Sequence, residues 1–237
     1  MIPKIIHYCW FGSGEMPERA MKCIESWHDN MPDWEYRLWN EDNFDISSYP
    51  YAQEAYDAKK YAFVSDVARL KVLKEFGGVY LDVDFKVFKP FDDLLQNEAF
   101  AGFEGSKTNP IMMGVIGSVQ DGSWVAEQLE RYQDRHFIVN GVPDMTTNVR
   151  FVTDWMMKHG FLPNGQDQVI NGIHVYPVDY FCPQLTTGEY KRTKNTYCEQ
   201  TEGVSSWAAL TPKDKLFKLL PAGVRVFLIK TKRFIFG

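Results

Sequence analysis

Hydrophobic residues alternate with polar ones in some segments of the chain and recur with a helical period in others. Residues 2–11 form a short apolar run closed by glycines, which is typical of a buried strand. An apolar stripe between residues 20 and 27, with spacings i, i+3, i+4 and i+7, predicts a helix. Alternation returns over residues 34–39. A strand, a helix and a strand in succession predict a βαβ unit with parallel strands.

The strongest helical pattern covers residues 54–76 and ends at Gly77 and Gly78. An alternating strand over residues 79–88 follows directly. Further strands are predicted within residues 94–103, 112–117 and 170–180, and further helices within residues 124–132 and 151–159. This order predicts an α/β fold. Ligands of such sheets bind beyond the carboxyl ends of the strands, which here are the loops after Phe11 and Trp39.

The composition is that of a globular protein. The chain has 237 residues, of which 45% are hydrophobic and 24% charged, so a disordered chain, a collagen-like fibre and a disulfide miniprotein are excluded. The length predicts one large domain, or a core with a smaller appendage. No membrane-spanning run and no signal-peptide pattern are visible, and the four scattered cysteines predict free thiols in a reducing compartment. We therefore expect a cytoplasmic protein.

Charge is distributed unevenly along the chain. The net charge is −5, which argues against bulk nucleic-acid binding. Residues 213–237 hold seven basic residues and one acidic residue, a net +6 that leaves −11 for the remainder. A basic and apolar tail of this kind predicts a segment that lies on an anionic membrane surface, at the inner face of the cell membrane. The alternative is a pair of C-terminal helices packed on the acidic domain.

Two aspartates lie close to the end of the strand predicted over residues 79–88. Its alternation places Asp82 and Asp84 on one face, about 6.6–7 Å apart. Two ionised carboxylates so close repel each other, and a divalent cation between them removes that cost. Hard oxygen ligands favour Mg²⁺ or Mn²⁺, which would in turn hold the phosphates of a substrate. The alternative is a half-exposed strand with two solvated acids.

Other phosphate-binding designs fit the sequence less well. The P-loop motif and the G-x-G-x-x-G motif are both absent. A phosphatase with an aspartate nucleophile also uses D-x-D at a strand end. That superfamily needs a small hydroxyl or apolar residue two positions further on, where this chain has Lys86. The sequence therefore favours a metal-assisted phosphate site that is neither a P-loop nor an aspartate phosphatase site.

Four segments together resemble bacterial glycosyltransferases of family 32, which carry a sugar-binding region with a DXD motif: IPKIIHYCWFG, WNEDNF, AKKYAFVSDVARLKVLKEFGGVYLDVDF and YPVDYFCP. The resemblance spans most of residues 1–210 and is dense over residues 2–88. The same core is similar to that of the clostridial glucosylating toxins. It implies a GT-A fold, which is a Rossmann-like, mostly parallel sheet flanked by helices, here with added helical segments. It also implies a nucleotide-sugar donor, Mn²⁺ or Mg²⁺, and retention of anomeric configuration.

The resemblance also implies roles for particular residues. Trp10 would stack on the base of the donor, and Asp66 and Arg69 would hydrogen-bond the hydroxyls of the donor sugar. Tyr80 would contact the donor. Asp82 would face ribose, sugar and metal, and Asp84 would be a direct metal ligand. The alternatives are a core tryptophan at position 10 and, for Asp66 and Arg69, a surface i,i+3 ion pair that contributes only a few tenths of a kcal/mol.

Near the C-terminus the chain departs from the family pattern. Family members have His-His-x-x-x-Ser-Trp, whereas this chain has Thr201 and Glu202 at the two histidine positions and retains Trp207. The toxins' Glu-x-x-Ser-x-Trp loop fits Glu202, Ser205 and Trp207. Carboxylate oxygen is a hard ligand, so Glu202 is predicted to be the third metal ligand, with Ser205 and Trp207 on the donor. The alternative is an exposed acid in a flexible loop.

These observations predict a retaining, metal-dependent glycosyltransferase with Asp82 and Asp84 in its catalytic core. We expect a domain over residues 1–210 and a tail over residues 211–237. The donor would be a nucleotide hexose, with UDP-linked sugars preferred over GDP-mannose. The acceptor would be a glycan or lipid-linked molecule in bacterial surface polysaccharide synthesis. A carbohydrate-binding protein without turnover and a protein-modifying effector are the alternatives.

Details of the reaction are less well determined by the sequence. Retention is compatible with a carboxylate nucleophile or with same-face attack. We favour same-face attack, because the sequence singles out none of Asp42, Glu104 and Asp167 as the nucleophile. Two polar clusters, residues 146–148 and 166–168, would line an acceptor cleft or, as we prefer, form solvated loops.

Overall fold

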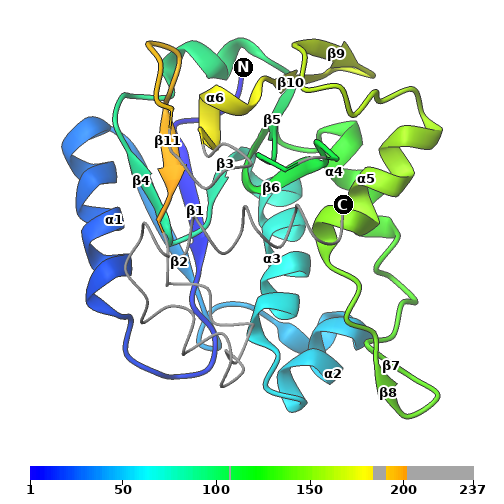
Figure 1. The fold of residues 1–237 in the computed structure, drawn as a ribbon. Coiled ribbons are helices and arrows are strands. Elements are labelled where there is room, and N and C mark those ends of the chain that lie inside the picture. Colours follow the sequence, from blue (N-terminus) through cyan, green and yellow to red (C-terminus); the bar gives the residue numbers. More distant parts are fainter. Residues whose placement is uncertain (107, 184–190, 202–237) are drawn as a thin grey trace, which may run out of the picture.

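A seven-stranded sheet forms the centre of the computed structural model, which describes residues 1–106, 108–183 and 191–201 (Figure 1). In spatial order its strands are β2 (Glu35–Trp39), β1 (Ile5–Cys9), β3 (Gly78–Leu81), β6 (Ile111–Ser118), β5 (Ala99–Phe103), β10 (Ile173–Tyr176) and β9 (Gln168–Ile170). The pairing directions show that β6 and β9 run opposite to the other strands. The sheet is therefore mostly parallel.

Two small ribbons and several helices complete the described part of the chain. The ribbons pair β4 (Phe85–Val87) with β11 (Cys198–Gln200), and β7 (Ile138–Val139) with β8 (Val142–Pro143). The α-helices are α1 (Glu18–Asn30), α2 (Pro50–Asp57), α3 (Tyr61–Phe76), α4 (Ser123–Glu130), α5 (Asn148–Lys158) and α6 (Val178–Phe181). Two 3₁₀ turns cover Ile46–Ser48 and Asp92–Gln96.

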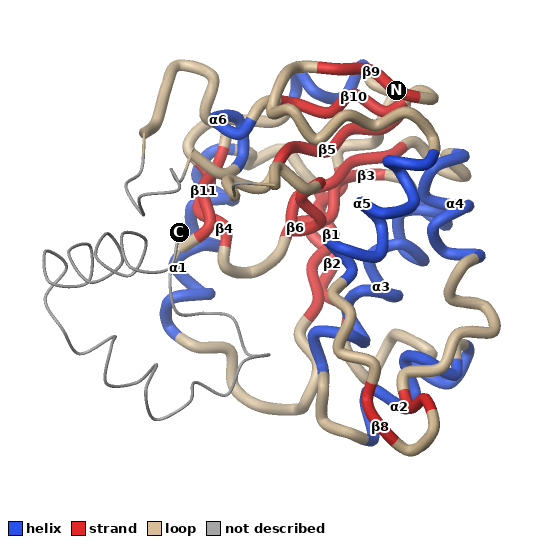
Figure 2. Tube along the Cα trace, turned by 45° about the vertical axis from the view of Figure 1, so that its right-hand side comes forward, coloured by secondary structure: helices blue, strands red, loops and turns tan. Residues whose placement is uncertain are grey.

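Both faces of the sheet are covered (Figure 2). Each face has its own hydrophobic cluster. Helices α2, α3, α4 and α5 pack on one face, and α1, α6 and the β4–β11 ribbon on the other. Strand β3 shows the alternation, because Tyr80 joins the first cluster while Val79 and Leu81 join the second. Strands buried on both faces explain the continuous apolar runs in the sequence. The predicted α/β fold of GT-A type, with added helical segments, is confirmed.

The predicted N-terminal βαβ unit is also confirmed. Strands β1 and β2 are parallel, with Ile5 opposite Glu35 and Cys9 opposite Trp39. Helix α1 buries the predicted apolar stripe, which consists of Ala20, Cys23, Ile24 and Trp27. The indole Nε1 of Trp27 donates a hydrogen bond of 2.7 Å to the carbonyl of Phe85, so α1 is tied to β4 as well as packed on it.

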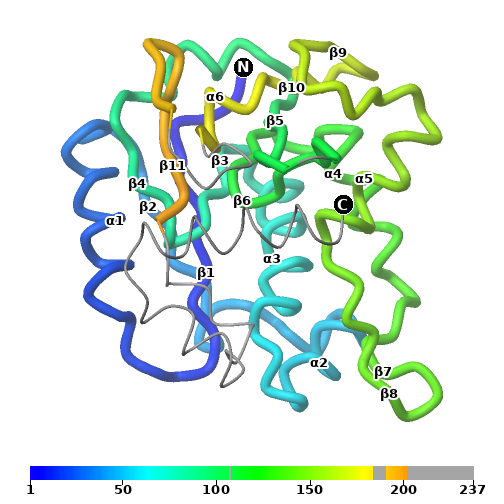
Figure 3. Tube along the Cα trace, viewed as in Figure 1, coloured from blue at the N-terminus to red at the C-terminus, as the bar shows by residue number. Residues whose placement is uncertain are grey.

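Two predicted elements are each divided in the structure. The helix expected over residues 54–76 is α2 and α3, separated at Lys59, which has a φ of 57° and so cannot continue a helix. The strand expected over residues 79–88 ends at Leu81. A turn follows, closed by a 3.1 Å hydrogen bond from the Phe85 N–H to the Asp82 carbonyl. Strand β4 then leaves the main sheet and pairs with the sequence-distant β11 (Figure 3).

The C-terminal predictions fall outside the described residues. This holds for the domain boundary at residue 210 and for the tail over residues 211–237. Within the described residues, no helix combines the length and the apolar character that crossing a membrane would require.

A buried histidine joins β1 to the end of α3. The side chain of His7 has no exposed surface, and its Nδ1 accepts a 3.1 Å hydrogen bond from the Trp39 indole. Its Nε2–H therefore donates the 2.8 Å bond to the carbonyl of Gly77. The next residue, Gly78, has a φ of 108°, and a Cβ there would lie 2.7 Å from the Ile5 carbonyl oxygen. The glycines that were predicted to end the helix are thus also needed for close packing, because a side chain at position 78 would clash with β1.

The His7 side chain makes the stability of the fold depend on pH. Burial lowers the pKa of His7 to about 4, below its unfolded value of about 6.5. As pH falls through this interval, the unfolded state takes up the proton first, and this group removes about 1.4 kcal/mol of unfolding free energy per pH unit. We expect the slope of the unfolding free energy against pH between about 6.5 and 4 to be less positive by this amount in His7→Gln than in the parent protein, as measured by urea unfolding.

The matched control is His28→Gln, at an exposed histidine on α1. It should leave the slope of the parent protein unchanged. Equal slopes for the parent protein and His7→Gln would contradict the assignment of this titration to His7.

Candidate active site

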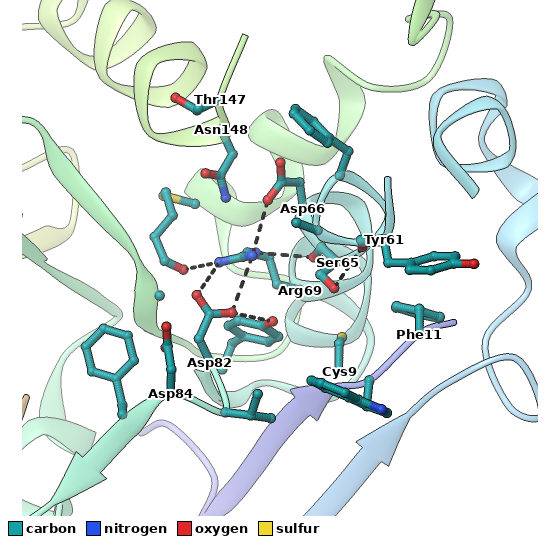
Figure 4. Close-up of a pocket in the computed structure, with 18 of the residues that line it drawn as sticks. Cys9, Phe11, Tyr61, Ser65, Asp66, Arg69, Asp82, Asp84, Thr147 and Asn148 are labelled. Carbon is teal, nitrogen blue, oxygen red and sulfur yellow. Dashed lines mark hydrogen bonds and ion pairs between the residues drawn. The ribbon is translucent and has the colours of Figure 1, made fainter. Parts of the chain in front are cut away.

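A pocket of about 480 Å³ lies at the carboxyl ends of β1 and β3 (Figure 4). It is lined by the loop after β1, the first turns of α3, the turn after β3, the start of β6 and the start of α5. The structure brings six of the predicted site residues to this pocket: Trp10, Asp66, Arg69, Tyr80, Asp82 and Asp84. The other three, Glu202, Ser205 and Trp207, lie outside the described residues.

The loop after β1 is held in place by several hydrogen bonds. The Trp10 indole donates to the Gly14 carbonyl at 2.6 Å, and the Gly12 N–H donates to Glu41 Oε1 at 2.6 Å. Gly12 has a φ of 104°, and a Cβ there would lie 2.4 Å from the ring of Tyr61. Glu41 belongs to the loop after β2, which was expected to form part of the site. That loop supports the wall of the pocket and does not line it.

Arg69 is the central side chain of the pocket, and only 5% of its surface is exposed. Its Nη1 donates to the Met113 carbonyl at 2.6 Å, and its Nε donates to the Ser65 carbonyl at 3.2 Å. Its Nη2 lies 3.2 Å from Asp66 Oδ1 and 3.5 Å from Asp82 Oδ1. The alternative of a surface ion pair between Asp66 and Arg69 is therefore wrong, because the two side chains are only 9% and 6% exposed.

The carboxylates around Arg69 lie in a desolvated environment. The pKa of Asp66 is raised to about 7, chiefly by burial. The nearby Arg69 lowers this pKa and Asp82 contributes to raising it. Tyr80 lies under the guanidinium, with its ring centroid 4.5 Å from the Arg69 Cζ. Burial also raises the pKa of Tyr80, so its hydroxyl remains protonated and donates to Asp82 Oδ1 at 2.8 Å.

Asp82 and Asp84 do not share one face of a strand, as the sequence pattern predicted. They lie in the turn after β3 because the backbone leaves the sheet there, but both still line the pocket. Asp84 Oδ2 accepts a 2.8 Å hydrogen bond from Gln200. Asp84 Oδ1 is buried and has no hydrogen-bond partner among the described residues. Burial, followed by the charge of Asp82, raises the pKa of Asp84 to about 7.

The end of β11 is attached to this turn. Thr201, at the position of the first family histidine, donates from its backbone N–H to the Asp84 carbonyl at 2.7 Å and from its hydroxyl at 2.9 Å. Thr201 therefore supports the turn through its backbone and hydroxyl groups. Over the described ranges, no group of three His, Cys, Asp or Glu side chains is arranged to hold a metal ion.

Some pocket residues were considered in the sequence analysis but were not assigned to the site. Thr147 and Asn148 line the pocket, which contradicts our preference for a solvated loop at residues 146–148, whereas residues 166–168 are not part of its lining. Glu104 also lines the pocket, but Asp42 and Asp167 do not. Ser65 was not named in the sequence analysis; its spacing of four residues from Arg69, one helical turn, was the only local signal for their contact.

The buried charge of Arg69 should be important for stability. Replacing Arg69 with Met leaves Asp66 and Asp82 without their cation, and loss of one partner of a buried ion pair typically costs about 3–5 kcal/mol. Urea unfolding of Arg69→Met should show a loss of this size. Arg150→Met is the control, because its i,i+4 pair with Asp154 is exposed and should contribute less than about 0.5 kcal/mol. Similar losses in both variants would contradict the buried network.

Comparison with known proteins identifies the region around this pocket. Residues 17–101 match the family described as "Glycosyltransferase sugar-binding region containing DXD motif". The chain is 37% identical over 103 residues to "Inositol phosphoceramide mannosyltransferase 3" of Schizosaccharomyces pombe, which covers 42% of this chain and 29% of the relative. It is 30% identical over 147 residues to "Mannosyl phosphorylinositol ceramide synthase CSH1" of Saccharomyces cerevisiae, covering 58% of this chain and 38% of the relative.

Among solved structures, "PaToxG Glycosyltransferase" matches 54% of this chain and 59% of its own, with 19% identity and a TM-score of 0.44. The alignments thus span well under half the length of the two fungal relatives. Because these relatives are fungal, the resemblance is not specific to bacterial enzymes. Residues 17–101 match a glycosyltransferase sugar-binding region with a DXD motif, which agrees with the predicted enzyme class, a glycosyltransferase.

Proposed function

We propose that this chain transfers a hexose, with retention of configuration, from a nucleotide sugar to a glycan or lipid-linked acceptor, and that the reaction requires a divalent metal ion. The observation that carries the proposal is the pocket itself. It brings Asp82 and Asp84 together with the buried pair of Asp66 and Arg69, and all four residues lie within the family-matched segment. Its volume of about 480 Å³ is in the usual range for small-molecule sites.

The carboxylates of the turn fit a divalent cation. Within residues 1–106, 108–183 and 191–201, the buried Asp84 Oδ1 atom has no hydrogen-bond partner, and a buried acceptor of this kind is costly unless a ligand satisfies it. Carboxylate oxygens suit Mn²⁺ and Mg²⁺, so Asp82 and Asp84 would hold the ion, with Glu202 as the proposed third ligand. When bound, the ion would stabilise the negative charge that develops on the departing diphosphate.

The remaining side chains supply position and electrostatics. Arg69 is fixed by two backbone carbonyls and cannot swing away, so Asp66 is held in one orientation toward the pocket. We assign this pair to the hydroxyls of the donor sugar, with Tyr80 supporting Asp82 from below. Trp10 offers an indole face for the base, and Ser205 and Trp207 would complete the donor site. Same-face attack, with the departing phosphate taking the proton of the acceptor, remains our proposed route to retention.

The names of the relatives refine the proposed substrates. Both fungal relatives are named for mannosyl transfer to an inositol-containing ceramide. We therefore propose mannose as the first donor sugar to test, ahead of the UDP-linked hexoses suggested by the sequence. A lipid-linked acceptor is supported by the same names and by the basic, apolar composition of residues 211–237. A role in bacterial surface polysaccharide synthesis remains part of the proposal.

The test is the release of nucleoside diphosphate from GDP-mannose and UDP-glucose with and without Mn²⁺. The parent protein should hydrolyse one of these donors slowly, and only with metal. Asp84→Asn should lose about 100-fold or more of this activity, because a metal ligand is removed. The same variant should unfold at equal or higher urea concentration in the absence of metal, because an uncompensated buried carboxylate is removed.

Asp134→Asn is the matched control, since Asp134 is exposed on the surface. It should change neither donor hydrolysis nor stability. Nucleotide sugar that binds but is never cleaved would instead support the alternative of a carbohydrate-binding protein without turnover.

A further inference from the structure

Glu104 is a pocket carboxylate that the proposed metal and donor sites do not use. It follows directly after β5 and lines the same pocket as Met112, Met113 and Asn148. None of the described residues donates a hydrogen bond to its carboxylate or pairs with it as a cation. Burial raises the pKa of Glu104. A partly buried carboxylate without a donor is stabilised when a ligand hydroxyl supplies one.

Asn148 presents the complementary group in the same pocket. Its Oδ1 accepts a 2.7 Å hydrogen bond from the N–H of Val149, which fixes the orientation of the amide. The Nδ2 atom therefore points away from this contact, is buried, and has no hydrogen-bond partner in the part of the chain that the structure describes. In Figure 4 the side chain of Asn148 points into the pocket toward Asp66 and Arg69.

The start of α5 is held rigidly enough to position this amide. Thr147 caps the helix by accepting a 3.4 Å hydrogen bond from the N–H of Arg150. Farther along the helix, the Thr153 hydroxyl accepts a 3.1 Å bond from the N–H of Ile111, at the beginning of β6. Asn148 thus belongs to an element that is attached to the central sheet.

We propose that Glu104 and Asn148 form a sugar-hydroxyl subsite, in which the amide Nδ2–H donates to a hydroxyl oxygen and that hydroxyl, or its neighbour on the ring, donates to the carboxylate. The inference rests on the proposed function, because it specifies a ligand group in the same pocket. Both residues lie outside the family-matched segment 17–101. The hydroxyl belongs either to the sugar of the donor or to the acceptor, and the chemistry is the same in both cases.

The test uses two near-isosteric variants of the full chain. Glu104→Gln removes the anionic acceptor. Asn148→Asp removes the donor but keeps an oxygen for the Val149 N–H and suits the first turn of a helix. Affinities for GDP, GDP-mannose, UDP and UDP-glucose are measured by calorimetry with Mn²⁺. Donor hydrolysis and transfer to methyl α-mannoside are measured alongside. Glu130→Gln, at an exposed position on α4, is the control and should match the parent protein.

The expected result is a selective loss in both variants. If the hydroxyl is on the donor sugar, affinity for the nucleotide sugar falls about 10- to 100-fold, while affinity for the bare nucleotide is unchanged. If it is on the acceptor, donor affinity and hydrolysis are unchanged, while the KM for methyl α-mannoside rises by a similar factor. A purely structural role would instead weaken nucleotide and nucleotide sugar equally, which would overturn the subsite.

Two further outcomes separate this inference from the proposed function. If the parent protein hydrolyses a nucleotide sugar and both variants behave like the parent in every measurement, the subsite is overturned and the proposed function stands. If the parent protein binds and hydrolyses none of the nucleotide sugars, the proposed function fails and the subsite fails with it.

Discussion

The guanidinium group of Arg69 connects the three elements that define the pocket. It bonds its own helix through the carbonyl of Ser65, the start of β6 through the carbonyl of Met113, and the turn after β3 through Asp82. An arginine is suited to this task because its donors form a rigid planar fork that a lysine cannot reproduce. The position of the aspartate turn relative to α3 therefore depends on a single buried cation.

The same arrangement gives the pocket an unusual electrostatic state. Burial raises the pKa values of Asp66 and Asp84 to about 7, and one cation faces several acidic groups. The free protein thus holds desolvated carboxylates that its own side chains only partly satisfy. Binding of a cation or of sugar hydroxyls relieves this cost, so ligand affinity and the stability of the turn are expected to be coupled.

The sequence predicts the layers of the fold better than the shape of the site. An apolar run located β1, and alternation located β2 and β3. The stripe on α1 was correct residue by residue, because each pattern reports burial of a local segment. The splitting of residues 79–88 could not be seen in this way. Both β3 and β4 alternate, and only the pairing of β4 with β11, which is more than 100 residues away, shows that they belong to different sheets. Asn148 was assigned to a solvated loop for the same reason, since spacing carries no information about contact between distant segments.

The ribbon formed by β4 and β11 has a consequence for how this protein matures during synthesis. The aspartate turn is completed only when Gln200 and Thr201 bond to Asp84, yet the family-matched segment ends at residue 101. About a hundred further residues must leave the ribosome before these bonds can form. At roughly 5–20 residues per second, about 5–20 seconds pass between synthesis of the family-matched segment and synthesis of Gln200 and Thr201. During this time the aspartate turn lacks its hydrogen bonds to β11. Chaperones and metal ions would therefore encounter the nascent chain before the aspartate turn has its hydrogen bonds to β11.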